Sequence, residues 1–446
     1  MNGRGKMSLM ANGRGKMSLM AIEELIEKKP IGQQVTIRGW VFRRRKSGKI
    51  IFLVIREKGA ILQCTFEEAV IGSDLFQTAD NATIESAVEI TGAIREEKRS
   101  PGGIEISGSK IAVVGLSEVF PITRDQSVEF LLDNRHLWLR SRQLTYIQQI
   151  RAAVFEAARE WFKLNNFLEV HCPMFITAAV EGGSTLFKMK YFDIDAYLTQ
   201  SSQFYLETLI FSLGAVYTIA PSFRAEKSRT IRHLTEFWML EAEMPFCDLK
   251  QNMEIQENLL AHICQSIAKS KGEQLKFLGR NPSELMITPP FERISYTEAI
   301  DLLNQKGHKL EWGEDFGAEE ERILTQDKKI PLFVYNYPRV AKAFYHKLDP
   351  ENPKVVNCAD LLAPEGHGEI IGGGQRTHDQ AELIQRIQDD NLNPDAYKWY
   401  IDLRKYGTVP HSGFGLGTER IVKWMCKLES IRDAIAYPRT INRVYP

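Results

Sequence analysis

The sequence predicts an α+β protein, in which a small N-terminal β-barrel precedes a larger domain built on an antiparallel β-sheet flanked by helices. Three observations lead to this fold class. Short alternating strands with glycine-bearing turns follow Gln33, helical periodicity begins at Leu144, and apolar strand-like runs recur over residues 217–243 and from Pro331 onward. Period-two and period-3.6 patterns in separate parts of one chain are typical of α+β folds.

Length and composition indicate a soluble globular protein with more than one core. The chain has 446 residues, 43% hydrophobic and 26% charged, and Lys+Arg and Asp+Glu both number 57. A neutral chain has no overall attraction for a nucleic acid, so such a partner needs a local basic patch. The six cysteines form no CxxC pair, and no apolar run approaches the roughly 18 residues of a membrane helix. We therefore expect reduced thiols, no membrane partner and a cytoplasmic location.

Residues 1–20 are predicted to be a disordered tail. Residues 2–10 and 12–20 are identical, NGRGKMSLM, with glycines and basic residues but no pattern that could form a core. An artefact such as a gene duplication is one origin of such a repeat, and a basic arm that touches RNA is the alternative to a disordered tail.

Residues 21–120 are predicted to form a barrel of the OB type. Five short strands, over residues 35–42, 49–57, 60–66, 86–96 and 104–114, are separated by turns. Arg43 and Lys49 supply charge near the first hairpin, while Phe52 and Gln63 add a ring and an amide on the next strands. This combination suits unpaired bases. The alternative is a solvated hairpin tip above an ordinary core phenylalanine.

The larger domain is expected at 143–446, after a charged linker at 121–142. A helix over 144–164 leads into the extended sequence FLEVHCPMF. Residues from about 250 to 329 are helical and charge-rich, and we interpret them as a surface insertion without chemistry.

The stretch 217–243 predicts two apolar strands joined by a long charged loop. Arg224, Glu226 and His233 lie in or beside this loop, and Phe237 follows it. A basic loop between aromatic strands suits an anion beside a flat ring, such as a nucleotide. An edge hairpin with a solvated tip is the alternative.

Two glycine-rich segments add parts that nucleotide chemistry needs. GFGLGTER, at 413–420, predicts a glycine-rich turn that enters a helix and ends in Arg420. GEIIGGGQR, at 368–376, predicts a flexible run in which Glu369, with Asp360, could hold magnesium while Arg376 reads a polar group. The alternative for the two carboxylates is ordinary surface charge.

FRAE followed by RHLTEF, the later GLGTER and the upstream WFKLNNFLEVHCPMF resemble the three ordered motifs of class II aminoacyl-tRNA synthetases, in their aspartyl/asparaginyl branch. The resemblance runs from about Gln33 to Pro446. It implies an enzyme that activates an amino acid with ATP and Mg2+ and transfers it to tRNA. It also implies a homodimer formed through the helix and extended segment closed by Pro173, and a barrel that reads the anticodon with Phe52 and Gln63.

The resemblance also assigns roles at the ATP site. Arg224 matches the arginine that clamps the α-phosphate and the attacking carboxylate, and Arg420 and His233 match groups on the outer phosphates. Phe237 matches the ring that stacks on adenine, with Glu226 as its hydrogen-bonding neighbour. Asp360 and Glu369 match the magnesium ligands. Gly372 departs from the aspartyl pattern, which usually has a serine there.

The amino-acid pocket is expected to favour asparagine, with tRNA(Asn) as the partner. The residues that resemblance or charge assigns to it are Glu181, Gln200, Ser201, Gln203, Glu207 and Arg376. Aspartyl relatives carry a lysine where Leu206 stands, and Glu207 can accept a hydrogen bond from a carboxamide. The alternatives are that Glu207 pairs with a helix neighbour and points away, or that aspartate is charged. An asparagine synthetase should lack the barrel, and a non-catalytic RNA-binding paralogue should lack a phosphate arginine.

Overall fold

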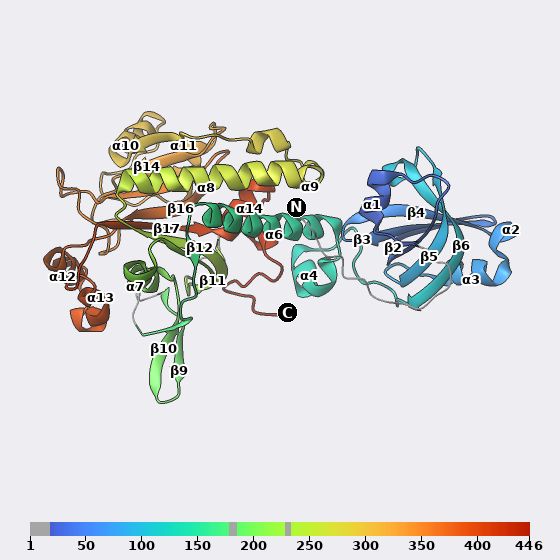
Figure 1. Cartoon of the computed structure of the whole chain (residues 1–446), viewed down its shortest axis with the longest axis horizontal. Coiled ribbons are helices and arrows are strands. Elements are labelled where there is room, and N and C mark those ends of the chain that lie inside the picture. The colour runs from blue at the N-terminus through green and yellow to red at the C-terminus, as the bar shows by residue number, and fades with distance from the viewer. Residues whose placement is uncertain (1–17, 178–184, 228–232) are drawn as a thin grey trace. The chain divides into compact units, whose positions relative to one another are not determined.

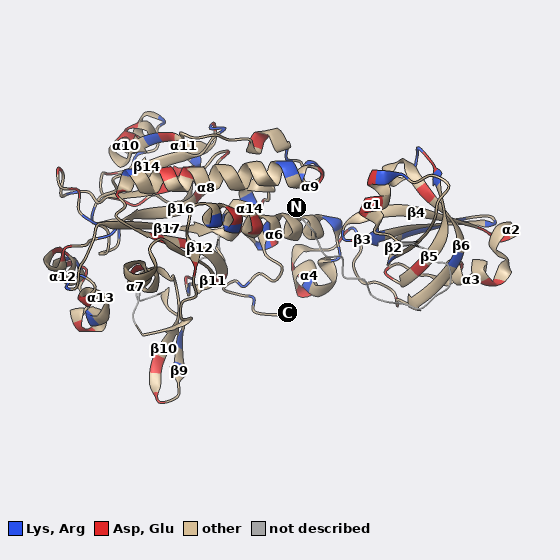
Figure 2. Ribbon diagram, viewed as in Figure 1, with Lys and Arg blue, Asp and Glu red and all other residues tan. Residues whose placement is uncertain are grey.

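The computed structural model describes residues 18–177, 185–227 and 233–446, and it divides into the compact units Met1–Thr145 and Tyr146–Pro446 (Figure 1). Acidic and basic residues are interspersed over both units in Figure 2, in keeping with their equal numbers. No described helix has the length and apolar character that crossing a membrane would require.

The first unit is a closed five-stranded barrel. Its strands are β2 (Gln34–Ser47), β3 (Ile50–Glu57), β4 (Ala60–Glu67), β5 (Ala87–Glu96) and β6 (Ile104–Gly115). The barrel closes because β2 pairs with both β3 and β5, while β6 pairs with β4 and β5. Alternate residues, such as Ile51, Leu53 and Ile55 of β3, are fully buried in its core. The period-two pattern therefore predicted every barrel strand.

The first unit also contains shorter elements. They are β1 (Ser18–Leu19), α1 (Ile22–Lys28), α2 (Glu68–Ile71), α3 (Ser73–Asn81), α4 (Val128–Asp133) and α5 (Arg135–Trp138). Strand β1 pairs with β2, although both of its residues fall in the predicted tail. The segment expected to be a linker contains α4 and α5, and Arg140 beyond them donates to Glu85 of the barrel at 3.2 Å.

An eight-stranded sheet forms the centre of the second unit. In spatial order its strands are β13 (Glu292–Ser295), β14 (Leu332–Tyr335), β15 (Cys358–Ala363), β16 (Gly368–Gln375), β17 (His411–Gly417), β12 (Glu236–Pro245), β11 (Val216–Phe223) and β7 (Leu168–Glu169). The six strands from β14 to β11 are antiparallel, and the two edge strands join in parallel. A small sheet of β8 (Phe175–Ile176), β9 (Lys188–Tyr191) and β10 (Ile194–Leu198) accompanies it.

The remaining helices follow the barrel along the chain. They are α6 (Arg142–Leu164), α7 (Gln203–Leu213), α8 (Leu249–Ser270), α9 (Gly272–Phe277), α10 (Tyr296–Gln305), α11 (Ala318–Thr325), α12 (Gln380–Asp389), α13 (Lys398–Asp402) and α14 (Thr418–Met425). Helices α7, α8, α10, α11 and α14 pack against strands of the central sheet. Helix α8 begins at a capping box of Asp248 and Gln251, and it contacts β15, β16 and β17. The expected surface insertion thus differs from the structure, because α8 covers the sheet and β13 is one of its strands. The amphipathic face of α8 has the sheet as its partner.

Candidate functional site

Two rows of residues that cross the central sheet form the floor of the candidate site. In one row, Asp360 of β15, Gly372, Gly415 and Glu241 of β12 lie side by side on successive strands. The neighbouring row runs through Gly374, Gly413 and Glu243. The glycines leave the middle of the floor without side chains, and a cavity of about 760 Å³ lies over it.

Close packing explains why these floor positions are glycine. A Cβ on Gly413 would overlap the carboxylate of Glu243, and a Cβ on Gly374 would come within 2.6 Å of Nδ1 of His346. Both glycine-rich segments lie largely in strands. Residues 413–417 belong to β17, so the prediction of a turn at 413–420 is wrong for these five residues. Residues 368–375 form β16, so the prediction of a flexible run at 368–376 is also wrong. Glycine can mark a close approach in a strand as well as a turn.

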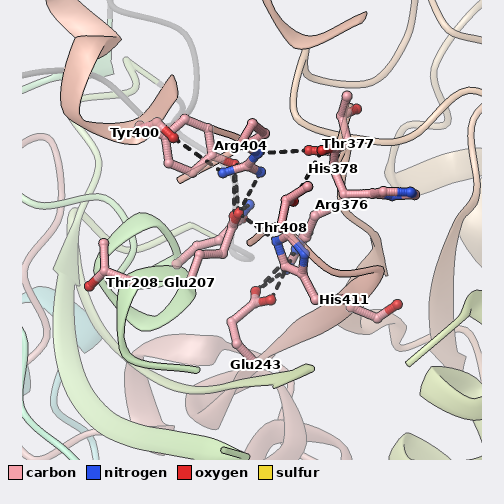
Figure 3. Close-up of polar contacts among 12 residues, drawn as sticks. Glu207, Thr208, Glu243, Arg376, Thr377, His378, Tyr400, Arg404, Thr408 and His411 are labelled. Atoms are coloured by element: carbon pink, nitrogen blue, oxygen red, sulfur yellow. Dashed lines mark hydrogen bonds and ion pairs between the residues drawn. The ribbon is translucent and has the colours of Figure 1, made fainter. Parts of the chain in front are cut away.

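Arg376 and Glu243 form a buried ion pair in the cavity wall (Figure 3). Nη2 of Arg376 lies 2.5 Å from Oε1 of Glu243, and Nε lies 3.1 Å from the same oxygen. The two residues are 3% and 1% exposed. Burial raises the pKa of Glu243 to about 8, with Glu207 and Glu241 acting in the same direction and Arg376 against them. The wall thus presents a strong donor beside a strong acceptor.

The start of α7 supplies polar groups next to this pair. Ser201 and Gln203 line the cavity. Ser201 donates through Oγ to Glu241, and the backbone N of Ser202 donates to the same carboxylate at 2.8 Å. Gln200 is buried, and its amide donates to Thr185 at 2.6 Å.

A second, smaller cavity of about 80 Å³ lies beside the first. Its described lining includes Arg224, Glu226, His233, Phe237 and Arg420. The guanidinium of Arg224 lies 5.4 Å from the ring centre of Phe237, and His233 lies 3.5 Å from Glu226. Arg224 and Glu369 line both cavities. A ligand that contains both a flat ring and an anionic group fits this arrangement. The aromatic side chain can stack on the flat ring, and the guanidinium at the junction of the two cavities can bind the anion where it meets a second substrate.

Two carboxylates converge above Gly372. A Cβ at this glycine would be 3.0 Å from an oxygen of Glu369 and 3.4 Å from an oxygen of Asp360. Lys342 approaches Asp360 at 2.7 Å, and Arg420 approaches Glu369 at 3.0 Å. Burial and the charge of Glu369 raise the pKa of Asp360 to about 6, although Lys342 opposes them.

Asp360 and Glu369 fit a magnesium ion whose other ligands are substrate phosphates and water. The described residues contain no group of three or more protein ligands. Mg2+ is commonly held by one or two carboxylates together with substrate phosphates and water, so this pair has the right chemistry beside the two cavities.

The barrel carries a separate candidate site on one face. Arg45 and Phe52 lie opposite each other on β2 and β3, and Arg43 and Gln63 flank Val54 on β2 and β4. The guanidinium of Arg45 lies 4.5 Å from the centre of the Phe52 ring. Gln63 donates to the buried Glu105 at 2.6 Å. Lys49 is exposed at the hairpin and lies 3.3 Å from Glu68.

Comparison with known proteins identifies the family. The family of tRNA synthetases class II (D, K and N) matches residues 127–441, and the OB-fold nucleic acid binding domain matches residues 35–114. The chain belongs to the class II tRNA synthetases. The predicted fold class, an OB-fold barrel followed by a class II catalytic domain, is thereby confirmed.

Relatives of this class II synthetase are similar over nearly their whole lengths. An asparagine--tRNA ligase of Thermoplasma acidophilum is 50% identical, over 96% of this chain and 100% of the relative. A crystal structure of asparaginyl-tRNA synthetase from Pyrococcus horikoshii complexed with asparaginyl-adenylate is 46% identical, with a TM-score of 0.91, and the match covers 94% of this chain and 97% of that one. An aspartyl tRNA synthetase from Entamoeba histolytica is 26% identical with a TM-score of 0.84, covering 98% and 96%.

The structure brings together most of the residues expected at the catalytic site of this synthetase. Gln200 is buried and lines neither cavity among the described residues. Glu181 lies outside the described residues. The expected contact of Glu207 with the substrate differs from the structure, because Glu207 is fully buried behind the cavity wall and bonded to Tyr400, Arg404 and His411.

Sequence reasoning missed several cavity-lining residues. Among them are Glu241, Glu243, Lys342 and His346. The alternation of Glu241 and Glu243 on one face of the apolar strand FWMLEAE was a usable signal, because a carboxylate on a buried strand needs a partner. Lys342 and His346 lie in an irregular segment, where no periodicity marks the inward face.

Proposed function

We propose that this protein activates asparagine with ATP to form asparaginyl-adenylate and then transfers the asparaginyl group to tRNA(Asn). The observation that carries the proposal is the buried pair of Arg376 and Glu243 in the wall of the large cavity. The relatives named as asparagine--tRNA ligases support it.

The pair fits a carboxamide better than a carboxylate. Glu243 engages Nε and Nη2 of Arg376, and Nη1 makes no hydrogen bond to any residue that the structure describes. Nη1 can therefore donate to the side-chain carbonyl of asparagine while Glu243 accepts from its NH2 group. Against aspartate, an ionised Glu243 offers like-charge repulsion instead.

The start of α7 and strand β12 would hold the main-chain part of the amino acid. An α-ammonium group needs acceptors, and Glu241 and Gln203 supply them in the same cavity wall. Ser201 holds the Glu241 carboxylate in place. We assign amino-acid binding to these residues and Arg376, with the buried Gln200 as support through Thr185.

ATP would bind across the junction of the two cavities. Phe237 offers a ring for adenine, and Glu226 offers an acceptor for its amino group. His233 and Arg420 lie in the same lining, where they can contact the outer phosphates. Asp360 and Glu369 would hold Mg2+, which supplies positive charge to phosphate oxygens when it is bound.

Arg224 then lies where the two substrates meet. The α-carboxylate of asparagine is already ionised, so its attack on the α-phosphate needs no base. The attack does bring two anions together, and a guanidinium that reaches both cavities can neutralise them in the transition state. We assign this role to Arg224.

The barrel face would bind the anticodon of the tRNA. Phe52 provides a partly exposed ring, and Gln63 provides an amide whose NH2 group is engaged by Glu105, so its carbonyl is left for a base. Arg43 and Lys49 add charge for the phosphates.

We further propose that the enzyme acts in the cytoplasm as a homodimer formed through α6 and β7. Strand β7 is at the edge of the sheet. Leu164, the last residue of α6, is 70% exposed, and Leu168 of β7 is 49% exposed. An apolar edge is suited to pairing with a second copy. Sedimentation analysis should give a dimer, and a monomer at all concentrations would contradict this assignment.

ATP–pyrophosphate exchange with a panel of amino acids, with and without tRNA, tests the proposed reaction. At pH 9, where Glu243 is ionised, we expect exchange with asparagine at a kcat/KM at least about 100-fold above that with aspartate, because a site built to hydrogen-bond a polar group rejects an analogue that lacks the donor. Comparable values for the two amino acids, or a preference for aspartate, would refute the asparagine assignment.

A further inference from the structure

A fully buried cluster, which we call the Glu207 network, lies behind the cavity wall (Figure 3). Glu207 of α7 accepts hydrogen bonds from Arg404 at 2.8 Å, from the hydroxyl of Tyr400 at 2.8 Å, from Nε2 of His411 at 3.0 Å and from Gln203 at 3.0 Å. Replacing a buried ion pair by apolar residues is often neutral or stabilising. A contribution to the stability of the fold is therefore a weak explanation for this cluster. Its position next to the cavity wall points instead to a role in substrate binding.

We propose that Glu207 is a positioning residue that makes the pocket selective for an uncharged side chain, although it never touches the substrate. This inference rests on the proposed function. It follows from three couplings between the Glu207 network and the cavity wall.

The first coupling fixes the amide of Gln203. An ionised carboxylate can only accept hydrogen bonds, so Gln203 must turn its NH2 group toward Glu207. Its carbonyl oxygen is then the atom that it can offer to the cavity it lines. Burial would raise the pKa of Glu207, but Arg404, His411 and Arg376 together outweigh it and hold this pKa well below its usual range. Glu207 is therefore ionised, and Gln203 presents an acceptor.

The second coupling holds the backbone around Arg376. The backbone N of Arg376 donates to the carbonyl of His411 at 2.9 Å, and Nε of Arg404 donates to the carbonyl of Thr377 at 2.9 Å. Two of the residues that bond to Glu207, His411 and Arg404, thus hold the backbone at Arg376 and at the residue that follows it. A shift of this carboxylate would move the guanidinium that reads the substrate side chain.

The third coupling is electrostatic. The charges of Glu207 and Arg404 balance each other. Removing the charge of Glu207 would leave Arg404 as an extra buried cation close to the side-chain pocket. Because charges interact strongly where water is excluded, the pocket would then favour aspartate relative to asparagine.

The test is Glu207→Gln in the full-length enzyme, which removes the charge and keeps the shape. We measure kcat and KM separately for asparagine, aspartate and ATP in exchange without tRNA. The asparagine-to-aspartate ratio of kcat/KM should fall about tenfold or more, because the uncompensated charge of Arg404 favours aspartate. KM for asparagine should rise, and KM for ATP should stay within twofold.

Glu257→Gln is the matched control. Glu257 is 3% exposed and pairs with Arg293 at 3.0 Å, in the same unit but outside the cavity lining. This variant should keep the wild-type ratio. If Glu207→Gln does not fold, Tyr400→Phe removes one hydrogen bond to Glu207 and should lower the ratio in the same direction, by a smaller factor.

The outcomes separate this inference from the proposed function. A folded Glu207→Gln or Tyr400→Phe enzyme with an unchanged ratio would overturn the inference, as would an equal loss of affinity for asparagine and ATP. A wild-type enzyme that prefers aspartate would instead refute the proposed function, before any variant is made.

Discussion

Arg224 is the residue on which activation should depend most, because it lines both cavities. Arg224→Ala should lower kcat for exchange by about 100-fold or more, since it removes charge neutralisation where the two anions meet. Exchange at saturating asparagine and ATP measures this effect. Arg99→Ala, whose side chain is 91% exposed on the barrel, is the control. Exchange near the wild-type rate in Arg224→Ala would remove this residue from the site.

Glu243 predicts a pH dependence of substrate choice. Its pKa is raised to about 8, chiefly by burial. Below that pH the carboxyl is protonated and can donate to the carboxylate of aspartate, whereas above it the ionised group accepts from asparagine and repels aspartate. The asparagine-to-aspartate ratio of kcat/KM should therefore rise between pH 6.5 and 9.

Glu243→Gln provides the control for this titration. Gln cannot ionise in this range, so the ratio should be low and independent of pH. A wild-type ratio that is flat over the same range would show that Arg376 keeps Glu243 ionised throughout.

The limits of prediction from sequence are clearest for Glu207. The sequence predicted correctly that Arg224, His233 and Phe237 share one cavity, because these three residues flank a single hairpin. Three of the four partners of Glu207 are 193, 197 and 204 residues further along the chain, and no period or motif links such distant positions. A glutamate at the start of an α-helix next to polar residues suggested a substrate contact, but tertiary packing determined its partners.

Strands β16 and β17 show the same limit at the scale of elements. Their glycines suggested a turn and a flexible run, since glycine frequently marks both. Strands with one packed face were predicted well, as in the barrel, where alternate residues are buried. In β16 and β17, however, glycine is required because carboxylates and an imidazole from neighbouring segments pass directly over the backbone.

Gly413→Ala tests this account of the floor. The new methyl group would overlap the carboxylate of Glu243 and displace it from Arg376. We expect KM for asparagine to rise by about tenfold or more, because the displaced carboxylate no longer accepts from the substrate, and overpacking should lower the melting temperature. Gly272→Ala is the control, since its Cβ would meet only Pro282 at 3.6 Å. Normal kinetics in Gly413→Ala would mean that the carboxylate of Glu243 does not pack directly against the backbone of Gly413.

The whole molecule consists of two compact units, and the proposed chemistry divides between them. The residues assigned to asparagine and ATP all lie in the second unit, whereas Phe52 and Gln63 lie in the first. Activation should therefore be independent of the barrel face, while transfer to tRNA should depend on it.

Phe52→Ala and Gln63→Ala test this division. Each should weaken tRNA binding and lower kcat/KM for aminoacylation about 5-fold to 100-fold, since a stacked base contributes about 1–3 kcal/mol. Both should leave tRNA-independent exchange unchanged, because no residue of the first unit lines either cavity among the described residues. Gln77→Ala, on the exposed surface of α3, is the control. Unchanged tRNA affinity in both variants would place the anticodon elsewhere, and a matching loss of exchange would show that the barrel also supports activation.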